Sequence, residues 1–183
     1  MNTSILTINP LTMIRKLHLR LLVKAGLVLG RNVYVDENVS FDSSFCWLIS
    51  IGDDCTLAHH VVILAHDAST KKHLGFTRIG RVQIGKKTFV GACSVILPGV
   101  TIGDNVIIGA GSVVTHDIPD NCVAVGNPAR IIKSTAEYTD EQKRKLSTRP
   151  KYTKKGWTPG NSLTKEKKRI MNEALSDGIG YIE

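Results

Sequence analysis

The side chains best suited to chemistry gather in one polar segment of this 183-residue sequence, from His66 to Arg81. The segment opens with a histidine beside a carboxylate, His66 and Asp67, and such residue types can move protons near neutral pH. Hydroxyls, lysines and a second histidine follow at Ser69, Thr70, Lys71, Lys72 and His73. Reactive groups in a polar loop are held in position by the rigid elements on either side of it. The flanking elements therefore determine which of these side chains can act together.

A six-residue repeat flanks the segment on both sides. Downstream, an aliphatic residue recurs at every sixth position, at Ile84, Val90, Ile96, Ile102, Ile108 and Val114. Small or β-branched residues share a second position of these units, at Thr88, Ser94, Val100, Val106 and Ser112. Upstream, the same period runs through Leu27, Val33, Val39, Phe45, Ile51, Leu57 and Ile63. This period fits neither one amphipathic helix nor one long strand, so each unit is a short strand followed by a corner.

Three units per turn predict an all-β fold, a parallel β-helix. Each aliphatic residue then points inward and stacks on its counterpart three units further along the chain. The handedness of the coil does not follow from the repeat, because the general rule for parallel crossovers would predict a right-handed coil. The spacing from Ile63 to Ile84 is not a multiple of six. The segment 66–81 is therefore expected to leave the coil as a protruding loop.

Histidine and cysteine placement does not favour a metal site. His59, His60 and His66 have the side chains of zinc ligands, but His60 and His66 are one unit apart and so lie on different faces of the coil. The four cysteines form no CxxC pair. We expect no bound metal, and reduced cysteines that are mostly buried.

The downstream repeats resemble the hexapeptide-repeat acyltransferases, most of all the sugar O-acetyltransferases such as maltose and galactoside acetyltransferase. The motifs that carry the resemblance are Pro98-Gly99-Val100, Gly109-Ala110-Gly111-Ser112 and Gly126-Asn127-Pro128-Ala129. The resemblance covers roughly residues 27 to 133. It implies a left-handed coil, against the general rule, and a homotrimer that binds acetyl-CoA in the groove between neighbouring subunits.

The resemblance also implies a catalytic residue. The family's catalytic histidine lies where the first repeat block meets the protruding loop, and His66 matches that position. A neutral imidazole there would take the proton of a sugar hydroxyl as the hydroxyl attacks the thioester. We expect Asp67 to orient that imidazole.

The same correspondence implies contacts to both substrates. For acetyl-CoA, these are backbone groups of Ala92 and Ala110 on the pantetheine arm, Thr115 and His116 near its far end, and Arg130 and Lys133 at the phosphates. The family often has lysine at the position of His116 and arginine at that of Lys133, and both departures weaken the phosphate contact. Asn38 is in phase with a substrate-binding asparagine, whereas a nearby family aspartate is replaced here by Cys46.

The two ends of the chain differ from the repeat. Residues 1–26 are expected to form a helix that caps the core, with an apolar stripe at Leu11, Ile14, Leu17 and Leu21. Its basic side chains leave a peripheral membrane contact as the alternative. After the β-helix of residues 27–133, residues 134–183 are expected to form a helical tail. A capping box at Thr139-Asp140-Glu141-Gln142 predicts its first helix, and a second is expected from about Leu163 to Leu175.

The net charge of +8 suits a polyanionic partner or a phosphate-bearing cofactor. We expect no nucleic acid, because the basic tail has no repeated aromatic platform on which bases could stack. No stretch approaches the ~20 apolar residues of a membrane span, and no signal peptide is recognisable, so we expect a cytoplasmic protein.

These observations together predict an acetyl-CoA-dependent O-acetyltransferase that modifies a hydroxyl of a sugar or polysaccharide. Three alternatives remain open. The first is an N-acetyltransferase acting on a nucleotide sugar. The second is a zinc-dependent hydratase resembling the γ-type carbonic anhydrases, and the third is a non-catalytic β-helix that serves as a binding scaffold.

Overall fold

A computed structural model describes residues 10–183 of the chain, which divide into two compact units. The first unit ends at Thr135, and the second runs from Ala136 to Glu183. Within residues 10–183, no helix is both long and apolar enough to cross a membrane.

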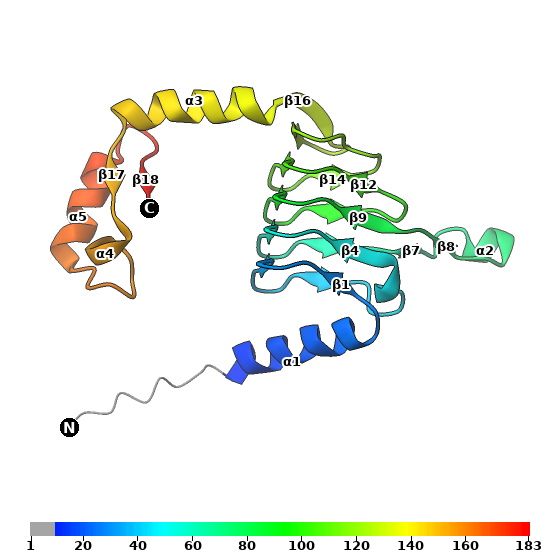
Figure 1. Ribbon diagram of the computed structural model, residues 1–183. Helices are drawn as coiled ribbons and strands as arrows, with labels where there is room; N and C mark the ends of the chain where they lie inside the picture. The colour runs from blue at the N-terminus through cyan, green and yellow to red at the C-terminus, as the bar shows by residue number, and fades with distance from the viewer. Residues whose placement is uncertain (1–9) are drawn as a thin grey trace. The chain divides into compact units, whose positions relative to one another are not determined.

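Three parallel sheets of very short strands form the first unit, and the chain visits them in a fixed order as it coils (Figure 1). The first sheet contains β1 (Val28–Leu29), β4 (Ile49–Ile51), β9 (Val82–Ile84) and β12 (Thr101–Ile102). The second contains β2 (Tyr34–Val35), β5 (Thr56–Leu57), β10 (Phe89–Val90), β13 (Ile107–Ile108) and β15 (Cys122–Val125), followed by β16 (Arg130–Ser134), which pairs with β15 in antiparallel fashion. The third contains β3 (Ser40–Phe41), β6 (Val62–Ile63), β11 (Val95–Ile96) and β14 (Val113–Val114).

The turns between sheets stack into edges of the coil, and two of these edges matter below. We call the turns from the second sheet to the third the second edge, at 36–39, 58–61, 91–94 and 109–112. We call the turns from the third sheet back to the first the third edge, at 42–48, 64–81, 97–100 and 115–118.

Downstream of the loop, the predicted inward residues form the core. The aliphatic series from Ile84 to Val114 is at most 3% exposed, and Ile63, Ile96 and Val114 are in register on adjacent strands. The small-residue series from Thr88 to Ser112 is buried as well. Its hydroxyls find partners, since Thr88 Oγ1 donates to Gly103 O at 2.9 Å and Ser94 Oγ to Gly109 O at 3.0 Å. The predicted period is confirmed here.

In the first coil the predicted register is wrong. The residues in register with Ile51, Leu57 and Ile63 are Leu29, Val35 and Phe41, not Val33, Val39 and Phe45. The chain between these partners is longer than three repeat units, and the excess lies in the turn 42–48, which contains the 3-10 helix η1 (Cys46–Leu48). Residues two apart on a strand face the same side, so the apolar pattern alone fits either of two phases.

The N-terminal helix α1 (Pro10–Lys24) lies at the end of the coil nearest β1 (Figure 1). It docks through Leu22, which is buried, and Leu19, which packs against the core. The predicted stripe is wrong, because Ile14, Leu17 and Leu21 are 55–63% exposed. The side chain of Leu11 lies outside the described residues. Since apolar residues occur around most of this helix, helical spacing alone did not identify the packed face.

Between the third and first sheets, residues 66–79 form a hairpin that protrudes from the coil (Figure 1). Its strands are β7 (His66–Asp67) and β8 (Arg78–Ile79), which pair antiparallel. A short helix, α2 (Lys71–Leu74), ends at Gly75, whose φ of 76° is in the left-handed region that glycine tolerates. Gly80 N donates to Ala65 O at 3.0 Å and closes the base of the hairpin.

The second unit is helical, but its first helix begins earlier than predicted. α3 runs over Thr135–Thr148, so the residues of the predicted capping box lie inside it. The later helix, α5 (Lys165–Ala174), begins where Thr164 Oγ1 accepts from Lys167 N at 3.2 Å. Three short elements complete the unit: β17 (Lys151–Tyr152), α4 (Lys154–Trp157) and β18 (Tyr181–Ile182), which pairs with β17.

Only two of the four cysteines are buried, fewer than the sequence predicted. Cys46 and Cys55 are buried, whereas Cys122 is partly exposed and Cys93 is exposed. Cys93 lies in a turn of the second edge with φ of 59°, outside the stacked interior of the coil. All four thiols are free.

Candidate active site

His66 stands at the base of the hairpin, where β7 leaves the third edge. Its Nδ1 is in hydrogen-bonding contact with Oδ2 of Asp42, which lies in the long turn of the preceding coil. The Asp42 side chain is 2% exposed and that of His66 is 35% exposed. The pair therefore joins a buried carboxylate to an imidazole that a substrate can reach.

Backbone donors hold the Asp42 carboxylate in place. Ala65 N donates to Oδ2 at 3.0 Å, and Ser44 N donates to Oδ1 at 3.1 Å. Burial by itself raises the pKa of Asp42, but the hydrogen bonds from His66, Ala65 and Ser44 together outweigh burial and leave the pKa below its ordinary value. The carboxylate is therefore ionised at neutral pH.

An ionised acceptor at Nδ1 determines which imidazole nitrogen is free. Nδ1 donates its hydrogen to Asp42, so in the neutral ring Nε2 carries the unshared electron pair. The ring of Phe45 packs beside the imidazole, with centroids 5.2 Å apart, and Trp47 lies 5.5 Å beyond Phe45. This arrangement holds the imidazole between Asp42 and Phe45 and leaves it partly exposed to solvent.

Asp67, which the sequence predicted as the orienting carboxylate, is held elsewhere. Its Oδ1 accepts from Ser69 N at 2.9 Å, and its Oδ2 lies 3.5 Å from Arg78 Nη1. Hydrogen bonds from the backbone N–H and then the side chain of Ser69, and to a smaller extent the charge of Arg78, lower the pKa of Asp67. The contact with Nδ1 is made by Asp42, which sequence reasoning missed because the assumed register concealed the long turn. The sequence signal that could have indicated this role is that Asp42 directly follows Phe41, which points into the core.

Thr115 and His116 lie on the same edge as His66. Thr115 occupies the same column as Asp42 and Leu64, because Phe41, Ile63, Ile96 and Val114 are in register. Two strand spacings, about 10 Å, separate the coil of His66 from that of Thr115. Thr115 Oγ1 and His116 Nδ1 are hydrogen-bonded at 2.7 Å.

Ala92 and Ala110 lie on the second edge instead, one above the other on adjacent coils. Gly111 N donates to Ala92 O at 2.8 Å, which ties the two turns together. Arg130 and Lys133 lie on β16, at the end of the second sheet, and Arg130 is exposed. A single chain thus places the six residues predicted to bind acetyl-CoA in three separate groups.

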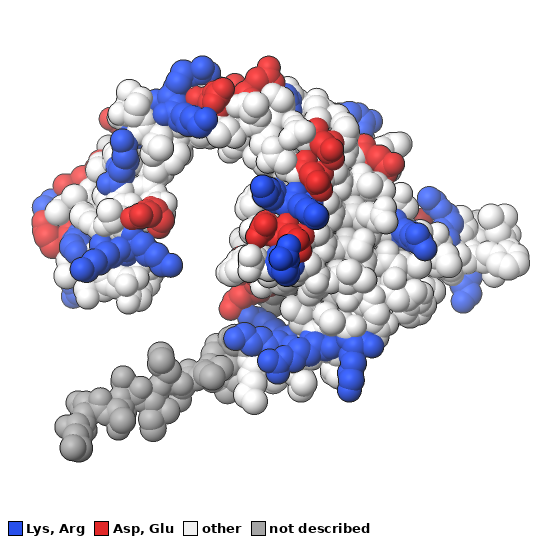
Figure 2. Space-filling view, viewed as in Figure 1, with Lys and Arg blue, Asp and Glu red and all other residues white. Residues whose placement is uncertain are grey.

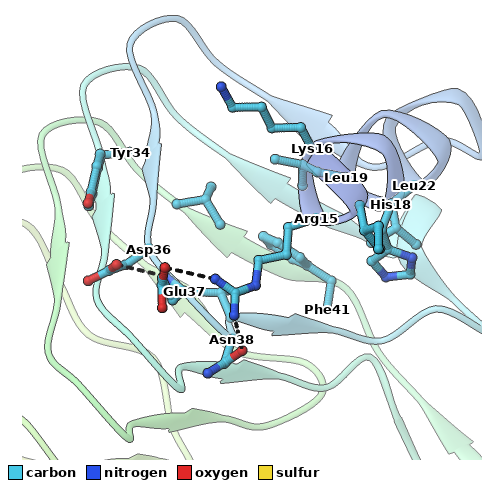
Figure 3. A pocket seen from close by; sticks show the side chains of 13 residues that line it. Arg15, Lys16, His18, Leu19, Leu22, Tyr34, Asp36, Glu37, Asn38 and Phe41 are labelled. Atoms are coloured by element: carbon cyan, nitrogen blue, oxygen red, sulfur yellow. Dashed lines mark hydrogen bonds and ion pairs between the residues drawn. The ribbon is translucent and has the colours of Figure 1, made fainter. Parts of the chain in front are cut away.

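Asn38 is also on the second edge, with φ of 59°. Its Oδ1 accepts from Arg15 Nη2 at 3.2 Å, and Arg15 also forms an ion pair with Glu37 at 2.9 Å (Figure 3). These residues line a cavity of about 540 Å³ between α1 and the first coil. His66 does not line this cavity, so one chain does not bring Asn38 and His66 together.

Comparison with known proteins identifies the fold and its relatives. Residues 81–116 match the family model for the bacterial transferase hexapeptide with six repeats. Galactoside O-acetyltransferase of Escherichia coli K12 is 38% identical over 112 residues, which are 60% of this chain and 54% of that protein. The chain thus spans about half the length of this curated relative.

Two solved structures match more of their length. A maltose O-acetyltransferase from Clostridium difficile 630 is 34% identical, with a TM-score of 0.52, over 65% of this chain and 75% of that one. A galactoside acetyltransferase in complex with coenzyme A is 30% identical, with a TM-score of 0.55, over 68% and 73%. These neighbours imply that the parallel coil is left-handed. The repeat, the three-sheet coil and these matches together show that the chain belongs to the family of hexapeptide-repeat acyltransferases.

Proposed function

We propose that this chain is an O-acetyltransferase that transfers an acetyl group from acetyl-CoA to a hydroxyl of a sugar or polysaccharide. The observation that carries the proposal is the pair of Asp42 and His66 at the base of the hairpin. It leaves Nε2 of a partly exposed imidazole available to accept a proton, as general-base catalysis requires.

The mechanism follows from that geometry. Acetyl-CoA supplies the activated acyl group as a thioester. Nε2 of His66 takes the proton of the acceptor hydroxyl while the hydroxyl oxygen bonds to the acyl carbon. The resulting imidazolium is stabilised by the charge of Asp42, and it returns the proton to the thiolate sulfur when the carbon–sulfur bond breaks. Both hydrogen and charge balance, and the transfer needs no covalent enzyme intermediate.

The distribution of the predicted contacts supports a homotrimer. His66, Thr115 and His116 follow the third edge, whereas Ala92, Ala110 and Asn38 follow the second. One acetyl-CoA molecule that touches both sets would lie in a groove between two copies, with the third edge of one subunit facing the second edge of its neighbour. Arg130 and Lys133 on β16 would then bind the phosphates at one end of that groove.

The proposal includes contact of α1 with a membrane surface, where a lipid-linked acceptor would be presented. The outer face of α1 exposes Met13, Ile14, Leu17 and Leu21. Its basic residues Lys16, Arg20 and Lys24 accompany them, and Figure 2 shows basic side chains gathered along part of this helix. Apolar and cationic groups on one exposed helix fit an anionic lipid surface. The cytoplasmic location stays a prediction.

The test is acetyl-CoA turnover, measured by release of free thiol across a panel of sugars, amino sugars and an acidic polysaccharide. We expect acceptor-dependent release that falls by a factor of ~100 or more in His66→Ala. His73→Ala, in the hairpin helix α2, is the matched control and should retain activity. A base-labile product ester would identify O-acetylation, and a stable amide would indicate an N-acetyltransferase instead. Failure to bind acetyl-CoA would favour the scaffold alternative, whereas binding without turnover would call for a wider panel of acceptors.

A further inference from the structure

A second cluster of reactive side chains lies on the second edge, away from Asp42 and His66. His59, His60 and Cys93 are exposed, and their ligand atoms all lie within 4.8 Å of one another. The two imidazole rings meet edge to face, with centroids 5.3 Å apart. Among residues 10–183, this is the one group of three histidine, cysteine or acidic side chains close enough to hold a metal ion.

The coil holds these residues in fixed relative positions. His59 and His60 occupy the turn after β5, and Cys93 occupies the equivalent turn one coil later. Cys93 N donates to His59 O at 3.0 Å, and His60 N donates to Glu37 O at 3.1 Å. The backbones of three successive turns are therefore tied together, while the three side chains are exposed.

The donor set selects the kind of metal. Imidazole nitrogen and thiolate sulfur are the ligands that Zn²⁺ prefers, whereas Mg²⁺ and Ca²⁺ prefer oxygen. Zinc bond lengths place two ligand atoms of a tetrahedral ion about 3.3–3.8 Å apart. Since all three side chains are exposed, modest rotations reach these separations from the present spacing.

A fourth group stands next to the cluster. Asn38 Nδ2 lies 3.4 Å from His60 Nε2, and Arg15 holds the carboxamide oxygen of Asn38 (Figure 3). In this contact Asn38 Nδ2 is the donor and His60 Nε2 is the acceptor, so a metal bound through Nε2 would take the place of Asn38. His66 takes no part, because it lies on the third edge with its Nδ1 on Asp42.

We propose that His59, His60 and Cys93 bind one Zn²⁺ per chain, with the fourth coordination position open to water or another small ligand. The site uses residues of one chain. These residues lie on the second edge, which in the proposed trimer borders the groove that holds acetyl-CoA.

The first experiment titrates the metal-free full chain with Co²⁺, which takes the place of zinc and gives a thiolate-to-cobalt absorption band. We expect saturation at one Co²⁺ per chain, and displacement of the band by Zn²⁺. Cys93→Ser should abolish the band, and His60→Asn should weaken binding by about tenfold or more. Asparagine suits the left-handed turn at position 60, where φ is 59°, so the second variant keeps the backbone. Cys122→Ser is the matched control and should leave the band unchanged.

A second readout is independent of cobalt. Zn²⁺ should slow alkylation of Cys93, and Cys122, which is partly exposed, should react at an unchanged rate in the same sample. The proposal is overturned if no saturable binding occurs at one ion per chain, or if the band survives Cys93→Ser in a protein with a wild-type unfolding transition. Equal protection of Cys93 and Cys122 would also overturn it, because that result indicates nonspecific binding. Acetyl transfer is measured separately with His66→Ala, so failure of one proposal leaves the other unaffected.

Discussion

Replacing Asp42 by asparagine tests the catalytic pair directly, because the side chain keeps its size and loses its charge. Oδ2 of Asp42 accepts from both Ala65 N and His66 Nδ1, and Oδ1 accepts from Ser44 N. An asparagine can supply only one acceptor oxygen. Whichever way its amide is turned, the NH₂ group faces a backbone N–H.

The expected magnitudes follow from these contacts. With the NH₂ group toward His66, Nδ1 becomes the acceptor, so Nε2 carries the hydrogen and cannot act as the base. With the oxygen toward His66, the tautomer survives but the imidazolium loses its counter-charge. Either outcome removes much of the general-base contribution, so kcat/KM should fall by ~10²–10⁴-fold, which is about 3–5 kcal/mol of transition-state stabilisation. The one backbone N–H that loses its acceptor should also lower the free energy of unfolding, by about 1–3 kcal/mol if it is the buried N–H of Ala65.

The assay is thiol release from acetyl-CoA with an acceptor identified in the panel, and Asp67→Asn is the matched control. Asp67 is adjacent to His66 in sequence, but its carboxylate is held by Ser69 and Arg78 at the protein surface. We expect Asp67→Asn to change kcat/KM by about threefold or less, because exposed ion pairs contribute little.

Two results would refute this reasoning. Asp42→Asn with near wild-type kcat/KM would show that the carboxylate does not support the base. A loss in Asp67→Asn as large as that in Asp42→Asn would restore the orienting role that the sequence predicted for Asp67. Both measurements need variants with cooperative unfolding transitions, which circular dichroism would establish.

Three further predictions concern the coil, the buried carboxylate and the assembly. Ile96 is fully buried between Ile63 and Val114, so Ile96→Ala should lower the free energy of unfolding in urea by about 2–5 kcal/mol, while a loss below about 1 kcal/mol would contradict the stacked core. The pKa of Asp42 is lowered in the folded state, so its carboxylate stabilises the fold above its ordinary value of about 4 and this contribution disappears as the pH falls through the lowered pKa. Urea unfolding between about pH 6 and pH 2 should therefore show a steeper acid loss in wild type than in Asp42→Asn, and parallel curves would count against the lowered pKa. Sedimentation equilibrium should give three times the 20.0 kDa mass of the chain, and a monomer at micromolar concentration would exclude the proposed groove between copies.

The sequence predicted the coil well where the repeat is regular. From Ile84 to Val114, one six-residue period describes both the inward positions and the strand register. It was less informative in the first coil, because two positions of each unit face inward and the pattern fits either phase. The packed face of α1 was missed for a related reason, since apolar residues around most of the helix offer more than one stripe.

The reactive residues were predicted unevenly for a physical reason. His66 comes soon after the last regular strand of the first repeat block. The break in the six-residue period therefore predicts that it lies at the start of the protruding loop. Asp42 and Cys93 acquire their partners, His66 and His60 respectively, through contacts between successive coils. Such contacts depend on the length of every intervening turn, and turn lengths are what a periodic pattern describes least well.

The two interruptions of the coil fall on the same edge in consecutive turns, and that coincidence builds the candidate active site. The turn 42–48 lengthens the first coil beyond three repeat units, and the hairpin lengthens the second still further, whereas the coil from Ile96 to Val114 keeps three units. Because the strands on either side stay in register, each interruption leaves the core intact and projects polar groups at the third edge. The first supplies a carboxylate that the backbone holds in a buried position, and the second supplies the imidazole beside it. Moving either interruption by one coil would add a strand spacing of about 4.8 Å between the two groups, which is more than a hydrogen bond can span. The regular repeat thus supplies the rigidity, and the placement of its two exceptions supplies the chemistry.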